Sequence, residues 1–578
     1  MYILGISAYY HDSAAVLIKD GKIVCGAEEE RFTRKKHDNG FPFKAIEFCL
    51  KEAGISIKQV NYVSYYEKPL LKFERLMETF VETYPCSLKV FLKGMPEHLD
   101  YKIKIQKTIK DKLKYKGKVY FVPHHLSHAA ASYYASPFKD SAVLTIDGVG
   151  EYQTTALWKG EGNKINLLKS IDFPDSLGLL YSTFTAFLGF KINDDEYKVM
   201  GLAAYGKPKY TKQIYKLIDV KDDGSFRMDQ SYFAYRESFK MWSKKFVKLF
   251  GKPRQPEGVM TQKHKDIAAS LQKVTEEIYF KILNHLYKQI NINNQQSAIS
   301  NLCLSGGVAL NALANGKIYE NTPFKNIYVF GAAGDSGGAL GSALLTYYFI
   351  LGKNRRNKIK DLYFGSSYSN SEIEKELEAY GLSYRKFSSE EKLIAEAAKL
   401  LSEGKIIGWF QGKMEFGPRA LGSRSILSSP NPRAMKEKVN RIKVREQFRP
   451  FAGSILQEKV DEYFKVPEKT HWSPFMIFCF IVKKDKRKEL AAIVHEDNTC
   501  RVQTVNRKDN GRYYKLINKY YNLTGTPCIL NTSFNLKGEP VVENPKQAIE
   551  DFLKTKMDHL VVGDYLVSKN FRRNFYSR

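Results

Sequence analysis

Cysteine is scarce in this 578-residue sequence, and long apolar runs are missing. The seven cysteines are an odd number without a CxxC pair, which argues against a disulfide framework and against a cysteine zinc site. The most apolar stretches, residues 339–351 and 473–482, are shorter than the roughly 18 to 20 residues that span a bilayer. We therefore expect reduced core thiols and no membrane-spanning helix.

The first residues lack the features of a secretory leader. Neither a basic segment nor a small-residue cleavage site accompanies the opening residues 1–6. We therefore expect a cytoplasmic protein without a membrane partner.

Acidic residues are outnumbered by basic ones. The sequence has 91 Lys and Arg against 62 Asp and Glu, a formal charge of +29, which suits a nucleic-acid binder, a membrane-surface protein or an enzyme for anionic substrates. Lysines spread along the chain favour general solvation, although residues 102–118 hold eight lysines and one aspartate. The length allows about two to four globular domains, so a single small binding module is excluded.

Two similar strand-turn-strand patterns indicate an internal duplication. The first covers residues 3–27 and the second covers residues 142–168, and helical periods follow each of them. Glycine-rich turns at residues 305–307 and 331–339 each come between a predicted strand and a predicted helix, where backbone N–H groups favour a phosphate. Glycine also serves turns that bind nothing, so each turn alone is a weak signal.

The polar, basic stretch at residues 352–358 predicts a linker. It divides the chain into a domain of residues 1–352, with a duplicated mixed sheet, and a domain of residues 353–578. The second domain opens with a helical pattern at residues 394–403 and a strand pattern at residues 405–410.

His124 and His128 stand four residues apart just after a proline. On a helix both imidazoles project from one face and can share a divalent metal. Asp147 and Asp335, in two glycine turns, would complete a His₂Asp₂ site with a position open to a ligand phosphate. Core or capping histidines are the alternative interpretation.

Two C-terminal motifs favour anion binding. Residues 417–425 and 443–451 interleave arginine and lysine with glycine and proline, and guanidinium groups match phosphate or carboxylate oxygens. A solvated basic face is the alternative. Residues 530–535 put small polar side chains at a strand end, where they either orient a nucleotide or carbonyl group or cap a turn.

Taken together these motifs resemble the NodU/CmcH family of O-carbamoyltransferases over essentially the whole chain. The shared segments are residues 5–6, 11–15, 29–37, 124–128 and 196–203, the two glycine turns and both C-terminal motifs. The resemblance implies an α/β fold, in which a duplicated actin-like ATPase domain (ASKHA class, Kae1-like) precedes a C-terminal YrdC-like α/β domain.

The resemblance also implies a two-step reaction. The YrdC-like domain would form carbamoyladenylate from carbamoyl phosphate and ATP with Mg²⁺, and the Kae1-like domain would pass the carbamoyl group to a hydroxyl of a small-molecule acceptor. AMP is then the leaving group, and two sites in one chain protect the anhydride from water.

The resemblance assigns site residues by matching positions. His11 would be the general base for the acceptor hydroxyl, with a structural turn histidine as the alternative. His124, His128, Asp147 and Asp335 would bind Fe²⁺ or another divalent ion. The nucleotide set would be Lys36, Gly306, Gly307 and Asn311. The set for carbamoyl phosphate and ATP would be Arg419, Lys443, Arg449, Arg501, Ser533 and Asn535.

The sequence leaves the acceptor open, because neither Tyr9-Tyr10 nor residues 222–256 hold a residue that fixes its identity. A polycationic acceptor is disfavoured at long range by the charge of +29. Two rival functions are a tRNA threonylcarbamoyl transferase and a non-catalytic ATP-binding regulator. We expect no nucleic-acid partner, and the oligomeric state stays open, with a homodimer as one option.

Overall fold

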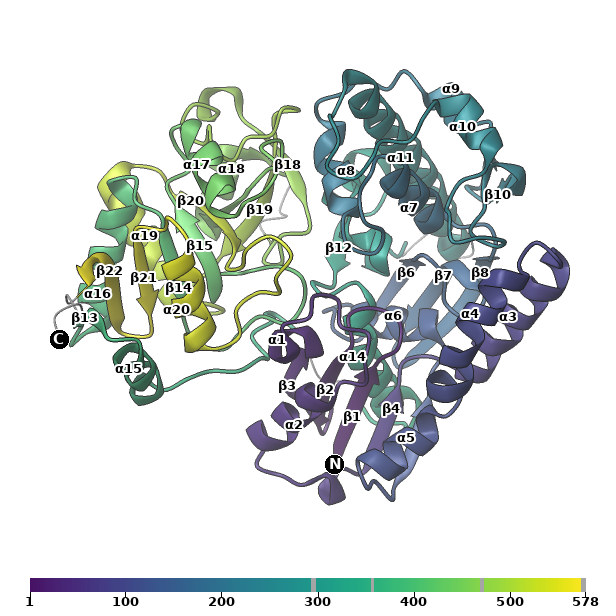
Figure 1. Cartoon of the computed structure of the whole chain (residues 1–578), viewed down its shortest axis with the longest axis horizontal. Coiled ribbons are helices and arrows are strands. Elements are labelled where there is room, and N and C mark those ends of the chain that lie inside the picture. The colour runs from purple at the N-terminus through teal and green to yellow at the C-terminus, as the bar shows by residue number, and fades with distance from the viewer. Residues whose placement is uncertain (293–297, 355–357, 468–471, 573–578) are drawn as a thin grey trace. The chain divides into compact units, whose positions relative to one another are not determined.

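The computed structural model describes residues 1–292, 298–354, 358–467 and 472–572. The chain separates into two compact units (Figure 1). The N-terminal unit contains residues 1–29 and 37–359, and the C-terminal unit contains residues 30–36 and the chain from residue 360 onward. The predicted boundary at 352/353 therefore differs by seven residues from this division, and residues 355–357 of the predicted linker lie outside the described residues.

The N-terminal unit contains two five-stranded sheets of identical topology. The first sheet has the order β3-β2-β1-β4-β5 and the second has the order β8-β7-β6-β11-β12. In the first sheet β1 pairs antiparallel with β2 and parallel with β4. In the second sheet β6 pairs antiparallel with β7 and parallel with β11. This repeated order confirms the predicted duplication. The strands are β1 (Tyr2–Ser7), β2 (Ala14–Lys19), β3 (Lys22–Glu28), β4 (Tyr62–Tyr65), β5 (Lys118–Phe121), β6 (Asp140–Ile146), β7 (Gln153–Glu161), β8 (Lys164–Asp172), β11 (Asn301–Ser305) and β12 (Asn326–Val329).

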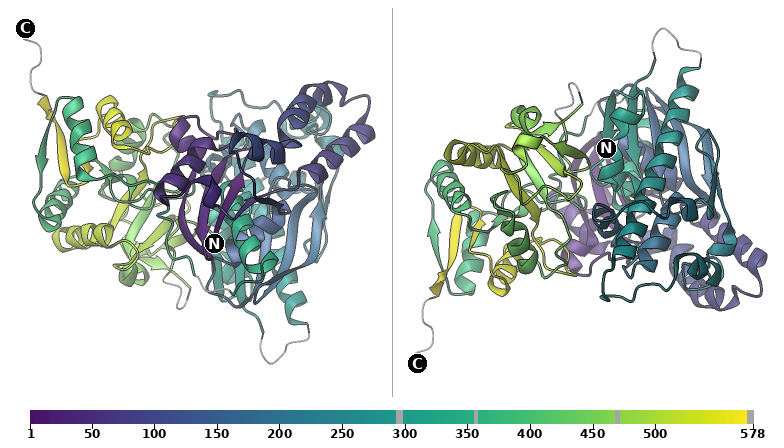
Figure 2. Two further views of the ribbon diagram at one scale, coloured as in Figure 1. Left: turned by 90° about the horizontal axis from the view of Figure 1, so that it is seen from below. Right: turned by 90° about the horizontal axis from the view of Figure 1, so that it is seen from above.

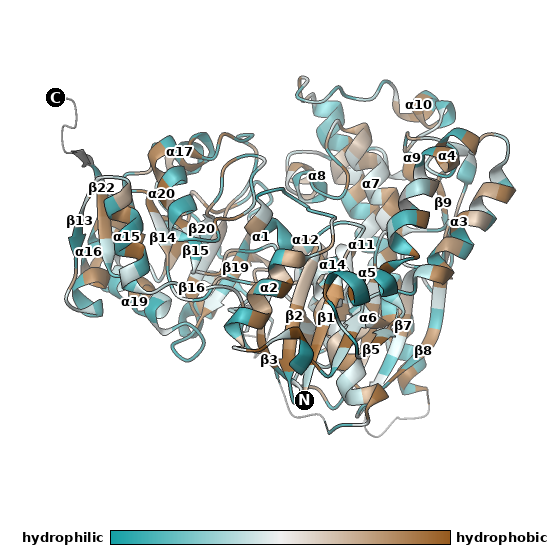
Figure 3. Cartoon of the chain, turned by 60° about the horizontal axis from the view of Figure 1, so that its bottom comes forward, coloured by the Kyte–Doolittle hydropathy of each residue, from teal (hydrophilic) through white to brown (hydrophobic). Residues whose placement is uncertain are grey.

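Two buried helices occupy equivalent places in the two halves. Helix α6 (His124–Tyr133) follows β5, and helix α14 (Asp335–Leu345) follows β12. The helices pack against each other, and α14 also packs on the apolar strands β1 and β2 (Figure 3). A Cβ atom on Gly341 of α14 would lie 1.9 Å from the carbonyl oxygen of Ser127 in α6. Glycine therefore permits the close approach of these helices.

Further helices fill the connections of the N-terminal unit. They are α2 (Phe43–Glu52), α3 (Pro69–Thr83), α4 (Leu88–Glu97), α5 (Ile105–Lys112), α7 (Leu177–Phe187), α8 (Glu196–Ala203), α9 (Thr211–Ile214), α10 (Lys244–Phe250), α11 (Gln262–Asn291), α12 (Ala312–Gly316) and α13 (Ile318–Asn321). A small hairpin joins β9 (Ile218–Val220) to β10 (Phe226–Met228). Within the described ranges, no helix combines the length and the apolar character needed to cross a bilayer.

The C-terminal unit is built on one mixed ten-stranded sheet with helices on both faces (Figure 2). The sheet order is β13-β22-β21-β14-β15-β20-β16-β19-β18-β17. Helices α16 and α19 pack together over a core that includes Leu401, Trp409 and Leu516. The predicted helix and strand at residues 394–403 and 405–410 match α16 and β14. Both units are mixed α/β structures, as predicted.

The elements of this unit have the following bounds. The strands are β13 (Leu382–Lys386), β14 (Ile407–Phe410), β15 (Arg424–Ser428), β16 (Ala452–Leu456), β17 (Phe464–Lys465), β18 (Cys479–Val482), β19 (Thr499–Val505), β20 (Cys528–Ser533), β21 (His559–Val562) and β22 (Tyr565–Arg572). The helices are α15 (Asn370–Ala379), α16 (Glu390–Ser402), α17 (Ala434–Ile442), α18 (Val460–Tyr463), α19 (Gly511–Thr524) and α20 (Pro545–Lys554), together with α1 (Glu29–Thr33), which lies mostly in the inserted segment 30–36.

The contact between α6 and α14 predicts a different response at two helical glycines. Gly341→Ala should lower the thermal midpoint of the N-terminal unit, because overpacking against backbone costs about 1 to 3 kcal/mol. Gly94→Ala in α4 is the matched control, since its Cβ meets nothing within 4 Å and alanine favours a helix. Calorimetric unfolding of both variants measures the difference, and equal midpoints would contradict the packing argument.

Candidate metal centre and anion site

Four buried side chains converge in the N-terminal unit. Nε2 of His124 and Nε2 of His128 lie 3.0 and 3.1 Å from Oδ2 of Asp147 and 3.1 Å from each other. Oδ1 of Asp335 lies 3.8 and 3.5 Å from the same two nitrogens. One ligand atom from each of the four residues lies within 4.8 Å of the others. The structure therefore brings together all four residues of the predicted metal set.

The secondary structure orients these side chains. His124 is the first residue of α6, and its backbone N–H donates to both carboxylate oxygens of Glu151 at 3.0 Å. Asp147 follows β6, and its Oδ1 accepts from the backbone N–H groups of Gly148 and Gly307 at 2.8 and 3.2 Å. These bonds direct the other oxygen of Asp147 toward the imidazoles.

The donor set fits a divalent metal ion. Neither carboxylate oxygen of Asp335, a residue that is 1% exposed, has a hydrogen-bond partner among the described residues. Burying an ionised carboxylate without a hydrogen bond is costly, so a bound cation would stabilise it. Two histidine nitrogens and two carboxylates suit divalent first-row metals.

Protons and metal compete for this centre. Burial alone would lower the pKa of His128, but the hydrogen bond to Asp147 and the charges of Asp147 and Asp335 raise it to about 9. Burial opposes ionisation of Asp147, yet His124 and His128 hold the pKa of its carboxyl well below its usual range. Without a metal, His128 is therefore an imidazolium at neutral pH.

His11 lies at the same end of the unit. Its Nδ1 is 2.9 Å from Oδ2 of Asp12. Burial would lower the pKa of His11, but the charges of Asp335, Asp12 and Asp147 raise it to about 9. The predicted general base is thus close enough to the metal centre to sense the charge of its carboxylates.

The glycine turn after β11 contacts the metal centre through Gly307. At Gly306, φ is +93° and a Cβ would lie 2.3 Å from the carbonyl oxygen of Ile146, so only glycine fits. Asn311 exchanges two amide hydrogen bonds of 3.0 Å with Gln272 of α11. Gln272 also donates to Glu276 at 2.9 Å. The sequence patterns did not single out Gln272 or Glu276, because their spacing is ordinary for a long amphipathic helix.

Lys36 belongs to the C-terminal unit, whereas the other residues of the predicted nucleotide set, Gly306, Gly307 and Asn311, belong to the N-terminal unit. Segment 30–36 joins the C-terminal unit, where Arg31 donates to the carbonyl oxygen of Gly417 at 2.7 Å. Arg34 donates to the carbonyl oxygens of Val541 and Pro540 at 2.7 and 2.9 Å. The charge of Lys36 acts on Lys443 of the same unit. Lys36 therefore accompanies the C-terminal cationic residues.

A buried lysine forms the centre of the C-terminal site. Nζ of Lys443, just after α17, donates to the carbonyl oxygen of Asn535 at 2.8 Å, to its Oδ1 at 2.9 Å and to the carbonyl oxygen of Ser533. Burial, and then the charges of Arg445 and Arg449, hold the pKa of Lys443 well below its usual range. Lys443, Ser533 and Asn535, three residues of the predicted set for carbamoyl phosphate and ATP, are therefore in direct contact. Arg449, a fourth member of that set, adds positive charge beside them.

Arg419 and Arg501 form a second pair of cations in this unit. Burial raises the pKa of the Cys479 thiol, and the charges of Arg501 and Arg419 oppose that rise, so both guanidinium groups lie near Cys479. The loop that carries Arg419 is shaped by Glu415, which accepts from the backbone N–H groups of Leu421 and of residues 423 and 424 at 2.7 to 3.2 Å.

Arg424, in the same motif as Arg419, is structural. It is fully buried, and its guanidinium lies 3.6 Å from the centre of the Phe410 ring. It donates to the carbonyl oxygens of Gln411 at 2.9 Å and of Ser366 at 3.0 Å. Backbone carbonyl groups therefore occupy the guanidinium of Arg424, which the sequence motif had suggested for anion binding.

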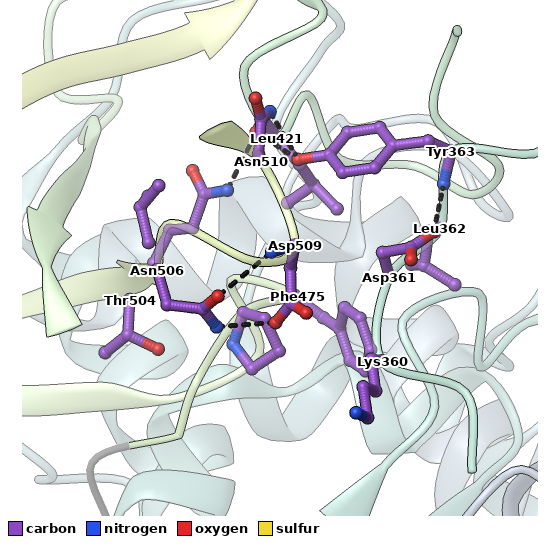
Figure 4. A pocket seen from close by; sticks show the side chains of 13 residues that line it. Lys360, Asp361, Leu362, Tyr363, Leu421, Phe475, Thr504, Asn506, Asp509 and Asn510 are labelled. Carbon is purple, nitrogen blue, oxygen red and sulfur yellow. Dashed lines mark hydrogen bonds between the residues drawn. The ribbon is translucent and has the colours of Figure 1, made fainter. Parts of the chain in front are cut away.

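A separate, small pocket lies in the C-terminal unit (Figure 4). Asp361, Asp509, Tyr363 and Asn510 lie in its wall, and none of the predicted site residues does. Burial raises the pKa of Asp361, and the charge of Asp509 adds to the rise. These carboxylates disfavour an anionic ligand, so this pocket is distinct from the cationic cluster.

Comparisons with known proteins cover almost the entire chain. A family model described as the carbamoyltransferase N-terminus matches residues 2–344, and one described as the carbamoyltransferase C-terminus matches residues 398–569. Uncharacterized protein sll1178 of Synechocystis is 44% identical over 98% of this chain and 97% of its own. Nodulation protein NolNO of Sinorhizobium fredii is 37% identical over 97% of this chain and 80% of its own.

Solved structures are more distant. The (R)-2-hydroxyglutaryl-CoA dehydratase component A of Acidaminococcus fermentans is 16% identical, covers 60% of this chain and 98% of its own, and has a TM-score of 0.32.

Metal binding should depend on His128 and on pH. His128→Ala should weaken binding of Fe²⁺ or Co²⁺ at least roughly a hundredfold, since one of four ligands is lost. Because the ion must displace the proton of His128, affinity in the wild type should rise with pH until about 9. Titration calorimetry measures both, with His285→Ala in α11 as the control. Unchanged affinity in His128→Ala would exclude this centre.

Proposed function

The chain belongs to the carbamoyltransferase family, and on this premise we propose that it is an ATP-dependent O-carbamoyltransferase that acts through carbamoyladenylate. The proposal assigns adenylate formation to the C-terminal unit and transfer to a hydroxyl of a small-molecule acceptor to the N-terminal unit. The observation that carries it is the buried Lys443 among Arg445 and Arg449, a cluster with excess positive charge that suits two phosphorylated substrates.

Carbamoyl phosphate and ATP would react in the C-terminal unit. Water would hydrolyse carbamoyl phosphate to carbamate and inorganic phosphate. An oxygen of the carbamate would then attack the α-phosphorus of ATP and expel pyrophosphate. The balance is one water consumed and one phosphate, one pyrophosphate and one carbamoyladenylate formed. Arg419, Arg449 and Arg501 would hold the phosphates, and Lys443 would neutralise charge that develops as pyrophosphate leaves. Ser533 and Asn535 fix the Nζ of Lys443 for that role.

Transfer would take place at the His₂Asp₂ centre. His11 would accept the proton of the acceptor hydroxyl through Nε2 while the hydroxyl oxygen attacks the carbamoyl carbon, and AMP would leave. A divalent ion held by His124, His128, Asp147 and Asp335 would supply positive charge for the adenylate phosphate. The backbone of Gly306 and Gly307 and the side chain of Asn311 would hold the nucleotide.

The acceptor is proposed only as a small molecule with a free hydroxyl. A net charge of +29 repels polycations at long range, so a neutral or anionic acceptor is favoured.

Adenylate formation should release pyrophosphate without an acceptor. Wild-type protein with ATP, Mg²⁺ and carbamoyl phosphate should release pyrophosphate, and Arg419→Ala should lower the rate roughly a hundredfold or more because a phosphate contact is lost. Arg433→Ala is the control, since the Arg433 side chain is 72% exposed. A coupled pyrophosphate assay gives the rates. No release from the wild type with Fe²⁺ present would reject adenylate formation, and tRNA gel shifts would then test the threonylcarbamoyl rival.

Lys443 should be needed for the same step. Lys443→Met keeps the length of the side chain but removes its charge, so pyrophosphate release should fall roughly a hundredfold while the fold is retained. Lys438→Met on the exposed face of α17 should keep the wild-type rate, because the Lys438 side chain is 51% exposed. Equal rates in the two variants would place adenylate formation elsewhere.

A further inference from the structure

Four side chains form a continuous line in the N-terminal unit. Nδ1 of His11 is 2.9 Å from Oδ2 of Asp12, whose Oδ1 is 2.6 Å from Nδ1 of His37. Nε2 of His37 is 2.9 Å from Oδ1 of Asp194. The predicted base His11 is thus the first member of a line of alternating imidazoles and carboxylates, and the last two members have no role in the steps described above.

The line joins three segments that are far apart in the sequence. Residues 9–13 are tied to residues 38 and 39 by backbone bonds of 3.0 Å from Tyr9 to Asn39 and from Ser13 to Asp38. The loop before α8 provides Asp194. Asp12 and His37 both have φ of 53°, a left-handed conformation that residues other than glycine rarely adopt. The surrounding contacts therefore hold both residues in place against a local strain.

The geometry fixes the protonation state of His37. Both of its nitrogens face ionised carboxylates, which only accept hydrogen bonds, so both nitrogens must donate and the ring is an imidazolium. Burial would lower the pKa of His37, but the bonds to Asp12 and Asp194 raise it to about 10. The distance of 2.6 Å to Asp12 is that of a charge-assisted hydrogen bond.

The line also fixes the tautomer of His11. Because Asp12 accepts a hydrogen bond from Nδ1, a neutral His11 keeps its proton on Nδ1 and has its lone pair on Nε2. The carboxylates of Asp335, Asp12 and Asp147 all favour the charged ring of His11. The His37 cation, bound to the other oxygen of Asp12, partly offsets this field. Other charged groups nearby include Lys72, which lies over the Tyr10 ring, Arg75, whose charge acts on Tyr10, and Lys191, which is 3.7 Å from Asp194.

We propose that His37 and Asp194 are positioning residues for His11: the His37 imidazolium, clamped between two carboxylates, locks Asp12 onto Nδ1 of His11, so that Nε2 is left to accept the acceptor's proton. This inference rests on the proposed role of His11 as general base. His37 never touches the reacting atoms. It acts through Asp12, which needs a cation on its second oxygen to hold one orientation.

The test is nuclear magnetic resonance of full-length protein labelled with ¹⁵N at histidine, between pH 6 and 10, with and without Zn²⁺. In the wild type, His37 should show two protonated nitrogens throughout pH 6 to 9, and neutral His11 should carry its proton on Nδ1. In His37→Gln, the pKa of His11 should rise by about one unit, because a cation near it is lost. His285→Gln should leave both signals unchanged.

Two outcomes would overturn the proposal. One is a His37 with a single protonated nitrogen at pH 7. The other is a His37→Gln variant in which the pKa and tautomer of His11 stay as in the wild type. Asp194→Asn provides a second variant should His37→Gln not fold: it should lower the pKa of His37 by removing one carboxylate, and an unchanged pKa would count against the clamp.

Carbamoyl transfer adds a separate measurement, with glycerol as the hydroxyl probe. The rate of His37→Gln should fall roughly tenfold at pH 7 and recover toward the wild-type rate only above about pH 10, where His11 of the variant is neutral again. A merely structural lesion would lower the rate at both pH values. Since the resonance measurements need no turnover, a wild-type protein that shows the clamp but transfers no carbamoyl group to any hydroxyl would refute the proposed function and leave the clamp established.

Discussion

The close approach of α6 and α14 is the constraint on which the N-terminal unit depends. Each helix follows the last parallel strand of one half of the duplicated fold, so the two helix starts meet at one end of the unit. Gly341 allows this contact, because any side chain there would collide with the backbone of Ser127. His124 and Asp335 are the first residues of the two helices. A wider separation of the axes would therefore pull the metal ligands apart.

Each unit gathers buried groups with the same sign of charge at its candidate site. Asp335 in the N-terminal unit has a buried carboxylate beside that of Asp147, whereas the buried Lys443 in the C-terminal unit has the charges of Arg445 and Arg449 beside it. Burying such groups costs free energy that a ligand of the opposite charge would offset. These charges support the proposal of different ligands, a divalent cation in one unit and phosphorylated substrates in the other.

The sequence predicted the duplicated sheet and the four convergent ligands because both leave local patterns: alternating strands around short turns, a pair of histidines one helical turn apart, and aspartates at strand ends. It could not place Lys36, because an inserted segment of seven residues joins the other unit only through tertiary contacts. Gln272 and Glu276 were missed because their spacing is ordinary for a long amphipathic helix, and His37 and Asp194 were missed because only tertiary contacts join them to each other and to Asp12. Arg424 looked like an anion ligand, and only its burial among carbonyl groups shows otherwise.

The proton affinity of His11 is set by a balance of charges around it. Three carboxylates favour its imidazolium, and an imidazolium cannot accept a proton from a hydroxyl. Asp147 and Asp335 are two of the three, and they are also the carboxylates that a divalent ion would share. The third, Asp12, already has the His37 cation on its far oxygen. In the proposed mechanism each of these three carboxylates therefore has a counter-cation, either the His37 imidazolium or the divalent ion, and a general base that works near neutral pH would need both.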